Sequence, residues 1–244
     1  MKIKLTILST LAILAILSST IASAFSGPIS LTDPNWTVSS RYTTNGSQTT
    51  KTSAPDIQTA TLLQFAFPNA GSSASNPTYA AFLLDKISLS LTNAQTITAT
   101  FSVPATSGTL FIGNPNGYAC GTATSVRLFF QSTGTGNPSG LTSTTFETHY
   151  WWSNPTDGST GSYSFTTGGT TGTVTLSVPL QGSDWSDFYG HFGTGLYLSN
   201  FNAALGAIKY IGLSFGSGCF FANGVGADYA TGSANFQLMS YTIS

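Results

Sequence analysis

The chain has 244 residues, of which only 6% are charged, and its formal net charge is −1 at pH 7. Ordinary soluble proteins carry about 25% charged residues. A chain this poor in Lys and Arg offers no basic face for nucleic acid and no electrostatic attraction to anionic lipid surfaces. Its solubility must come from Ser, Thr, Asn, Gln and Gly instead.

The first 24 residues have the pattern of a secretory signal peptide. Two lysines precede an apolar run over 5–17, and Ala22-Ser23-Ala24 supplies the small residues that a signal peptidase reads. The apolar run is shorter than the ~20 residues of a membrane span. We therefore expect a secreted protein with a signal peptide at 1–24, one domain at 25–244, and no membrane insertion after cleavage. An uncleaved N-terminal anchor is the alternative.

Short segments along the mature chain alternate apolar with polar residues, which predicts half-buried β-strands. The clearest are at 86–91, 96–103, 125–131, 173–178 and 210–215. Clusters of Gly, Asn, Pro and Ser separate them as loops and turns. Many short strands in one domain predict an all-β fold, which we expect to be a two-sheet antiparallel jelly-roll β-sandwich.

Four further segments have weaker patterns. Only 199–207 has the composition of a helical turn, and the Gly-Thr cluster at 166–172 predicts a hairpin between its flanking strands. Residues 25–80 alternate weakly, so we expect one or two edge strands there. The stretch 212–226 contains Asn223-Gly224, a strong turn signal, and we interpret it mainly as structural.

The two cysteines of the chain are Cys120 and Cys219. In an exported protein such a pair most simply forms one disulfide. Cys120 precedes the strand at 125–131 and Cys219 follows the strand at 210–215, and these ends meet if the two strands are antiparallel neighbours. Two free buried thiols are the alternative. A metal site lacks the ligand spacing, because the two histidines are distant.

The stretch THYWWSN, at 148–154, raises the question of where two adjacent tryptophans point. Neighbours on a strand point to opposite faces. We expect one face to be core and to hold Phe146, Tyr150 and Trp152. The opposite, outer face then holds Glu147, His149 and Trp151. The strand at 125–131 divides in the same way: Arg127, Phe129 and Gln131 lie opposite the apolar set Val126, Leu128 and Phe130.

Such an outer face suits a sugar, because an aromatic ring stacks on the C–H face of a pyranose while polar groups bind its hydroxyls. We therefore predict a glycan-binding patch with a partly exposed Trp151. Its candidate residues are Arg127, Phe129, Glu147, His149, Trp151 and Trp185. In the competing interpretation, the loop at 133–140 covers Trp151, and Glu147 and Arg127 form a cross-strand ion pair.

The stretch GSDWSDFYGHFG, at 182–193, has two interpretations. Asp184 and Asp187 are candidate Ca²⁺ ligands, because Ca²⁺ takes several oxygen atoms. Alternatively Ser183 or Asp184 caps a turn and Trp185 plugs one end of the sandwich. We favour the cap and plug.

The order VRLFFQS, YWWSN, TVTLSVPLQGSDWSDFYG, IGLSFGSGCFFANGVG and GSANFQLMSYTI resembles the galactose-binding-like jelly-roll domains of carbohydrate-binding modules, over roughly 85–244. The resemblance implies a jelly roll that binds a polysaccharide or glycan. Such domains often contain a structural Ca²⁺, but no ligand set in this sequence matches residue by residue. No other cofactor is implied.

Catalysis is not expected from this sequence. Glycoside hydrolysis needs two carboxyl groups across the sugar, and the spacing of Glu147 and the seven Asp favours no pair. No G-x-S-x-G motif precedes a helix, as a serine hydrolase would need. The expected function is a secreted, non-catalytic carbohydrate-binding β-sandwich. A structural or adhesive cell-envelope protein is the alternative, and a glycoside hydrolase ranks third.

Overall fold

The computed structural model describes residues 25–44, 47–71, 74–115, 123–133, 149–156, 160–217 and 221–244. The segment 1–24, both cysteines and Glu147 lie outside these ranges, so the signal peptide, the disulfide and the role of Glu147 stay predictions. None of the described helices has the length and hydropathy to cross a membrane.

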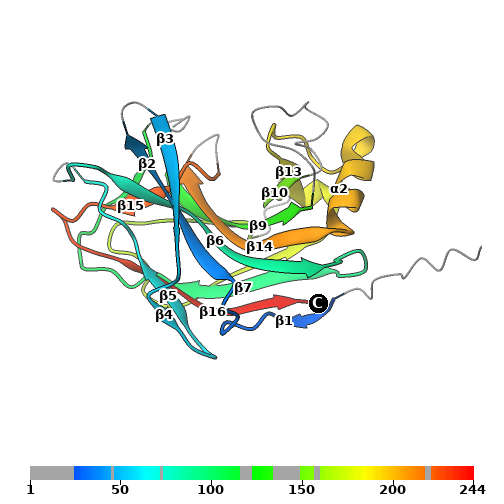
Figure 1. Ribbon diagram of the computed structural model, residues 1–244, viewed down its shortest axis with the longest axis horizontal. Helices are drawn as coiled ribbons and strands as arrows, with labels where there is room; N and C mark the ends of the chain where they lie inside the picture. Colours follow the sequence, from blue (N-terminus) through cyan, green and yellow to red (C-terminus); the bar gives the residue numbers. More distant parts are fainter. Residues whose placement is uncertain are drawn as a thin grey trace, which may run out of the picture.

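Within the described ranges, the larger of two antiparallel sheets has ten strands. They are β2 (Trp36–Thr44), β3 (Ser47–Ser53), β6 (Thr78–Leu89), β8 (Phe111–Gly113), β9 (Thr124–Ser132), β10 (Tyr150–Ser153), β11 (Ser162–Ser164), β13 (Trp185–Asp187), β14 (Ile208–Ser217) and β15 (Val225–Ala227). The order is β13-β10-β9-β14-β6-β15-β8, with β11 beside β9, β2 beside β6 and β3 beside β2. In Figure 1 this sheet forms the upper layer.

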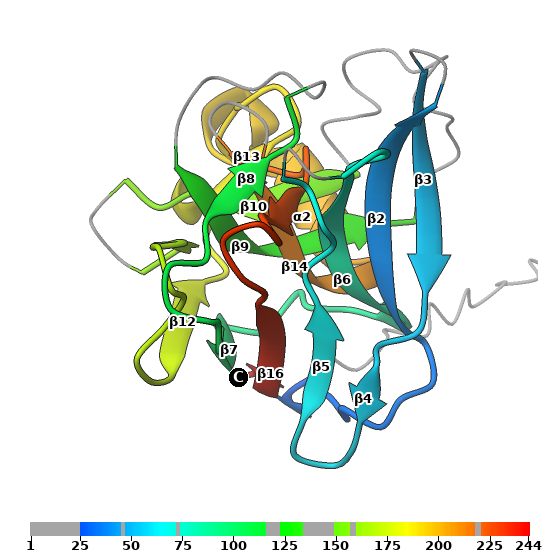
Figure 2. The same cartoon turned by 90° about the vertical axis from the view of Figure 1, so that its left-hand side faces the viewer.

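The smaller sheet has six strands in the part of the chain that the structure describes. They are β1 (Gly27–Pro28), β4 (Ile57–Gln58), β5 (Leu63–Ala66), β7 (Thr96–Ser102), β12 (Val174–Pro179) and β16 (Asn235–Ile243). The order is β12-β7-β16-β5-β4, with β1 beside β16. This sheet lies below the larger one (Figure 2). The predicted all-β fold of two antiparallel sheets packed as a sandwich is confirmed.

The main hydrophobic core lies between the sheets. Strand β7 shows how the sequence builds it: Ile97, Ala99 and Phe101 are fully buried, while the Thr residues between them face out of the core. Phe65 and Phe236 add stacked and edge-on ring contacts to the same cluster. Burial of this apolar surface, about 25 cal/mol per Å², is the main force that holds the sheets together.

Three short helical elements lie between β12 and β14 in the chain. They are η2 (Gly182–Asp184), which precedes β13, and η3 (Gly195–Tyr197) and α2 (Leu198–Leu205), which follow it. The expected helical turn at 199–207 is therefore confirmed. The ring of Phe201 on α2 lies 5.0 Å from that of Trp151 and 6.0 Å from that of Phe130, so α2 packs against the inner face of β9 and β10.

The predicted hairpin around 166–172 is wrong. Strand β11 pairs with β9 in the larger sheet, whereas β12 pairs with β7 in the smaller one. The Gly-Thr cluster therefore crosses between sheets. Strands β11 and β12 face the same core from opposite sheets. Two strands of a hairpin would show the same alternation of apolar and polar residues, so the sequence pattern does not separate the two arrangements.

The segment 25–80 contributes more strands than the one or two edge strands expected. Strand β2 is hydrogen-bonded on both sides, to β6 and β3, and β3 forms the edge. Only the start of β2 is apolar, with Trp36 and Val38 buried in the main core. The rest of this ribbon is rich in Ser and Thr, which hides its strand pattern.

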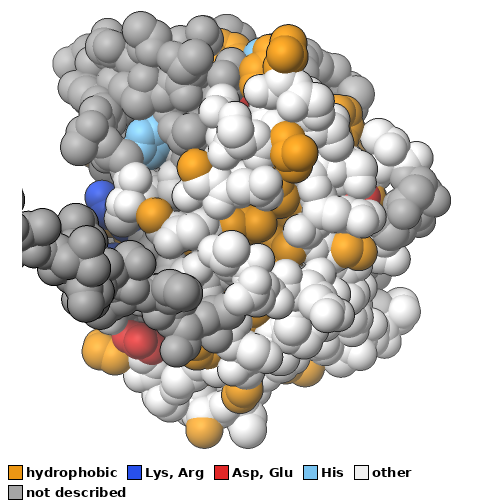
Figure 3. All heavy atoms as spheres, turned by 90° about the vertical axis from the view of Figure 1, so that its right-hand side faces the viewer, with side chains coloured by type: hydrophobic (Ala, Val, Ile, Leu, Met, Phe, Trp, Pro, Cys, Tyr) orange, Lys and Arg blue, Asp and Glu red, His pale blue; other side chains and the backbone are white. Residues whose placement is uncertain are grey.

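The described surface carries few charges. On the face in Figure 3, uncharged polar side chains and backbone dominate, hydrophobic side chains are scattered, and charged ones are sparse. This agrees with the charged fraction of 6% in the whole chain.

Candidate functional site

Strand β9 divides its side chains as the sequence predicts. Val126, Leu128 and Phe130 belong to the main core, while Phe129 belongs to a second cluster on the opposite face of the larger sheet. Strand β10 lies beside β9, also as expected. The larger sheet therefore has the predicted outer face, and the side chains of β10 determine which aromatic rings lie on it beside Phe129.

The tryptophans of β10 point the other way from the prediction. Trp151 lies opposite Phe130 and Trp152 opposite Phe129. Because residues directly opposite in a ladder share a face, Trp151 points into the main core and Trp152 lies on the outer face. Trp151 is fully buried and Trp152 is 3% exposed. The prediction of a partly exposed Trp151 beside Arg127 is therefore wrong.

Both indoles are buried because both faces of the sheet are covered at this point. The ring of Phe201 on α2 covers Trp151 from the inside. On the outside, Trp152 belongs to an outer aromatic cluster of Leu84, Phe129, Trp152 and Ala222, against which Phe82, Tyr150, Tyr210 and Phe221 pack. The two faces of a strand cannot both be buried without such cover.

The outer aromatic cluster is tightly packed. The ring of Phe129 lies 5.2 Å from that of Trp152 and 4.9 Å from that of Phe82. Tyr150 stacks on Trp152 with 16° between the ring planes. Burial raises the pKa of Tyr150, and the nearby Tyr210 raises it further. Phe129 is fully buried, so it supports the surface from below and does not form it.

Arg127 lies on the outer face, as predicted, but its guanidinium is committed to protein contacts. Nη1 donates to the Ser153 carbonyl oxygen at 2.8 Å and to Asn154 Oδ1 at 3.4 Å. The guanidinium carbon lies 3.9 Å from the centroid of the Phe221 ring. Burial lowers the pKa of Arg127 to about 10, so it remains charged at neutral pH. Arg127 thus ties together the two segments that carry Asn154 and Phe221.

Two other predicted site residues are buried. His149 is 3% exposed, with Nδ1 3.4 Å from the Ser132 carbonyl oxygen. Trp185 is fully buried, and its Nε1 donates to the Pro179 carbonyl oxygen at 2.8 Å. Trp185 therefore plugs the core as the favoured interpretation holds, and its ring is not available for stacking on a ligand.

The carboxylates of 182–193 make protein contacts. Asp184 Oδ2 accepts a hydrogen bond from Gln181 Nε2 at 2.7 Å. Gln181, not Ser183 or Asp184, is the N-cap of η2, and it makes no side-chain capping bond. Within the described ranges, no three His, Cys, Asp or Glu side chains come together as a metal site. The described residues therefore supply no further side chain to support a calcium site at Asp184 and Asp187.

Asp187 shapes the loop that follows β13. Its Oδ1 accepts the backbone N–H groups of Tyr189 and His191, both at 2.8 Å, and its Oδ2 lies 3.1 Å from His191 Nδ1. Gly190 closes the turn at a φ of +83°, a conformation that glycine adopts without strain. The loop therefore holds Phe188 and Tyr189 at its tip, where they are 37% and 49% exposed.

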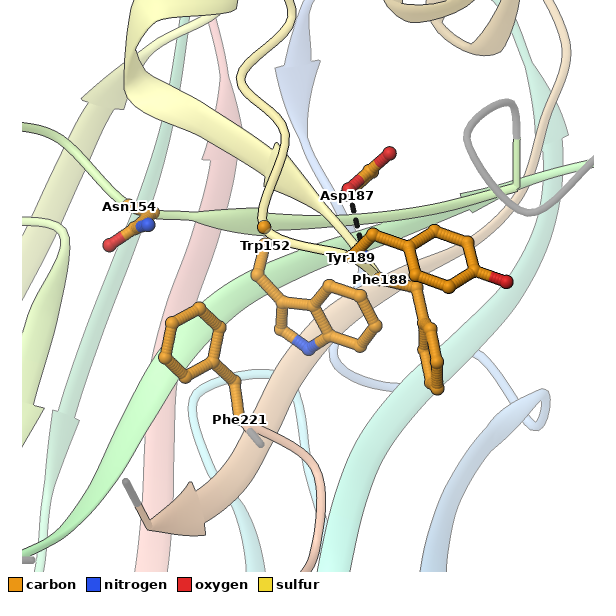
Figure 4. Close-up of a pocket in the computed structure, with 7 residues that line it drawn as sticks. Trp152, Asn154, Asp187, Phe188, Tyr189 and Phe221 are labelled. Carbon is orange, nitrogen blue, oxygen red and sulfur yellow. Dashed lines mark hydrogen bonds between the residues drawn. The ribbon is translucent and has the colours of Figure 1, made fainter. Parts of the chain in front are cut away.

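These two rings form one wall of a pocket beside the outer aromatic cluster. The pocket has a volume of about 250 Å³ and is lined by Trp152, Asn154, Asp187, Phe188, Tyr189, Gly190 and Phe221. In Figure 4 the Trp152 indole lies in the middle, with Phe221 on one side and Phe188 and Tyr189 on the other. Three segments distant in the sequence thus converge: the end of β10, the loop after β13, and the turn after β14.

Phe188, Tyr189 and Phe221 line the pocket but were not predicted from the sequence as site residues. One signal was present: two adjacent aromatic residues between Asp187 and Gly190 fall at the tip of a turn, where burial of both rings is difficult. No sequence spacing links that turn to Phe221. No protein-family model matches this chain, and the search of curated proteins finds no match either.

Proposed function

We propose that this chain is a secreted, non-catalytic carbohydrate-binding β-sandwich that binds a sugar ring in the pocket beside Trp152. The observation that carries the proposal is the composition of this pocket. Four aromatic rings line a hollow of about 250 Å³, and two of them, Phe188 and Tyr189, are also substantially exposed. Exposed aromatic rings around a concavity are typical of a binding site.

The polar groups of the pocket fit a neutral ligand. Asn154 Oδ1 accepts from Arg127 Nη1 at 3.4 Å and its Nδ2 donates to Ser186 Oγ at 3.2 Å, so the amide keeps one N–H and one lone pair for a hydroxyl group. Asp187 is the one carboxylate among the described lining residues, and both of its oxygen atoms are engaged within the loop. Because glycoside hydrolysis needs a pair of carboxyl groups across the sugar, this lining favours binding over catalysis.

The direct test is binding of the mature chain to insoluble cellulose, chitin, xylan and mannan in pull-down assays. We expect binding to at least one of them, and a loss of about tenfold or more in affinity for Tyr189→Ala and Phe188→Ala. A tenfold loss corresponds to about 1.4 kcal/mol, which is typical of an aromatic residue central to an interface. Tyr229→Ala, which removes a tyrosine that is 45% exposed outside the pocket, is the matched control.

A structural or adhesive role is the second candidate, favoured by a different surface. The outer face of the smaller sheet carries paired hydroxyl groups, with Thr98 and Ser177 3.0 Å apart and Thr100 and Thr175 3.2 Å apart. An array of hydroxyl groups on one face of a sheet suits contact with another extended surface. If no polysaccharide binds, and the chain self-associates in sedimentation experiments, this candidate replaces the first.

A further inference from the structure

Beyond the pocket, two more rings stack on each other. The angle between the ring planes of His191 and Tyr197 is 7°, and the two ring centroids lie 4.2 Å apart. Tyr197 ends η3, and His191 ends the loop that Asp187 holds. The hydrogen-bonded contact between Asp187 Oδ2 and His191 Nδ1 fixes the orientation of the imidazole, and the imidazole in turn supports the tyrosine ring.

This stacked pair continues the aromatic wall of the pocket. Successive ring centroids are 6.4 Å apart from Trp152 to Phe188, 5.4 Å from Phe188 to Tyr189, and 6.0 Å from Tyr189 to His191. We call these five residues, Trp152, Phe188, Tyr189, His191 and Tyr197, the aromatic row.

The row is exposed beyond the pocket, and its far end is apolar. The side chain of His191 is 36% exposed. The neighbours of Tyr197 on either side, Leu196 and Leu198, are 91% and 46% exposed. A leucine this exposed beside a partly exposed aromatic pair marks a surface for contact with another molecule.

The pocket by itself is small. Its volume of about 250 Å³ lies below the range of about 300–1,000 Å³ for sites that enclose drug-sized ligands. A single ring-sized group fits inside it. The remainder of a longer ligand would lie outside the pocket, where His191 and Tyr197 follow Tyr189 in the aromatic wall.

We propose that the aromatic row is an extended track, and that its ligand is a neutral polysaccharide chain with one sugar unit in the pocket and a unit beyond the second one over the His191–Tyr197 pair. This inference rests on the proposed function. The ligand is neutral because no described Lys or Arg lines the pocket, and the side chain of Asp187 is fully buried with both oxygen atoms engaged. Aromatic rings repeated along a surface suit a repeating chain, whereas a free monosaccharide uses only the pocket.

The test is calorimetric titration of the mature chain with di-, tri- and hexasaccharides of the cello-, xylo-, manno- and chito-series. In the series that binds, we expect the wild-type affinity to rise at least tenfold from the disaccharide to the hexasaccharide. Tyr197→Ala should retain the disaccharide affinity and lose this gain with length. Tyr189→Ala should weaken binding of every length, because its ring belongs to the pocket.

Two further variants separate stacking from folding. Tyr197→Phe keeps the ring and should keep the gain with length, and Tyr229→Ala should behave as wild type. Equal affinity for disaccharide and hexasaccharide would overturn the track and leave the single-sugar pocket standing. A retained gain in Tyr197→Ala would also overturn it. Absence of binding in all four series, at every length, would overturn the proposed function together with the track.

Discussion

The indole of Trp151 packs edge-on against the Phe201 ring of α2, with 5.0 Å between ring centroids and 77° between ring planes. This contact joins the helical segment to the larger sheet, deep in the main core. Trp151→Ala should therefore lower the free energy of unfolding by about 3–5 kcal/mol, the usual cost of truncating a large buried ring. Urea denaturation followed by circular dichroism measures it.

Tyr189→Ala is the control for that measurement. Tyr189 is 49% exposed at a loop tip, so its removal should change the free energy of unfolding by no more than about 0.5 kcal/mol. A cost below about 1 kcal/mol for Trp151→Ala would contradict its place in the core. Such a result would instead support the partly exposed position that the sequence predicts for Trp151.

The orientation of these two tryptophans shows where sequence reasoning reached its limit. In β9, three apolar residues alternate with polar and aromatic ones, and the buried face was predictable from that pattern alone. In β10, both alternating positions hold an indole, so alternation fixes the two faces but not which one is inward. The ladder register, Trp152 opposite Phe129, decides the question, and register between strands is not visible in either strand alone.

The pocket was less predictable than the fold for a related reason. Strand patterns are local, so the sheets could be expected from short segments. The pocket instead depends on the convergence of Trp152, the Phe188–Tyr189 loop tip and Phe221, which are brought together only by the packing of β9, β10, β13 and β14. Polar ribbons such as β2–β3 were also missed, because Ser and Thr do not mark a buried face.

Asp85 should make the fold more stable in acid than at neutral pH. Its carboxyl is fully buried between the sheets, and neither oxygen has a hydrogen-bond partner among the described residues. Burial, and to a smaller extent the nearby Asp33 carboxylate, together raise the pKa of Asp85 to about 7. The nearby Tyr241 donates its hydroxyl to the Gly212 carbonyl oxygen and does not pair with the carboxyl.

The sign of the effect follows from the two pKa values. An unfolded Asp releases its proton near pH 4, whereas the folded Asp85 retains it up to about pH 7. The stabilisation from this proton is complete below about pH 4, falls as the pH rises, and is lost above about pH 7. Three pKa units at about 1.4 kcal/mol each give a loss of roughly 4 kcal/mol.

Asp85→Asn isolates this contribution, because the amide has a similar shape and does not titrate. Denaturation at several pH values should show the stability of the wild type, relative to Asp85→Asn, falling between pH 4 and pH 7. A difference that stays constant, or that rises with pH, would show that the Asp85 carboxyl is charged in the folded protein.

Cys120 and Cys219 should form one intramolecular disulfide in exported protein. Strands β9 and β14 are antiparallel neighbours, with Thr124 opposite Ser217, so the strand pairing from which the bond was predicted is present. A bond that closes a loop of about 100 residues contributes about 4–5 kcal/mol in the chain-entropy model. Peptide mapping by mass spectrometry without reduction should find the linked pair. Alkylation of both thiols in unreduced, secreted protein would refute it.

Asp187 should control binding through the loop that it holds. Its carboxylate accepts two backbone N–H groups and contacts the His191 ring, and Phe188 and Tyr189 lie between these anchor points. Asp187→Ala leaves those donors without an acceptor, which costs about 1–3 kcal/mol of stability where they are buried. We also expect at least a tenfold loss of affinity for whichever polysaccharide the wild type binds. Asp187→Asn keeps an oxygen that can accept both N–H groups, so most of the binding should return.

If Asp187→Ala bound as tightly as wild type in calorimetric titration, the orientation of Phe188 and Tyr189 would not matter for the ligand, and the pocket wall would lie elsewhere.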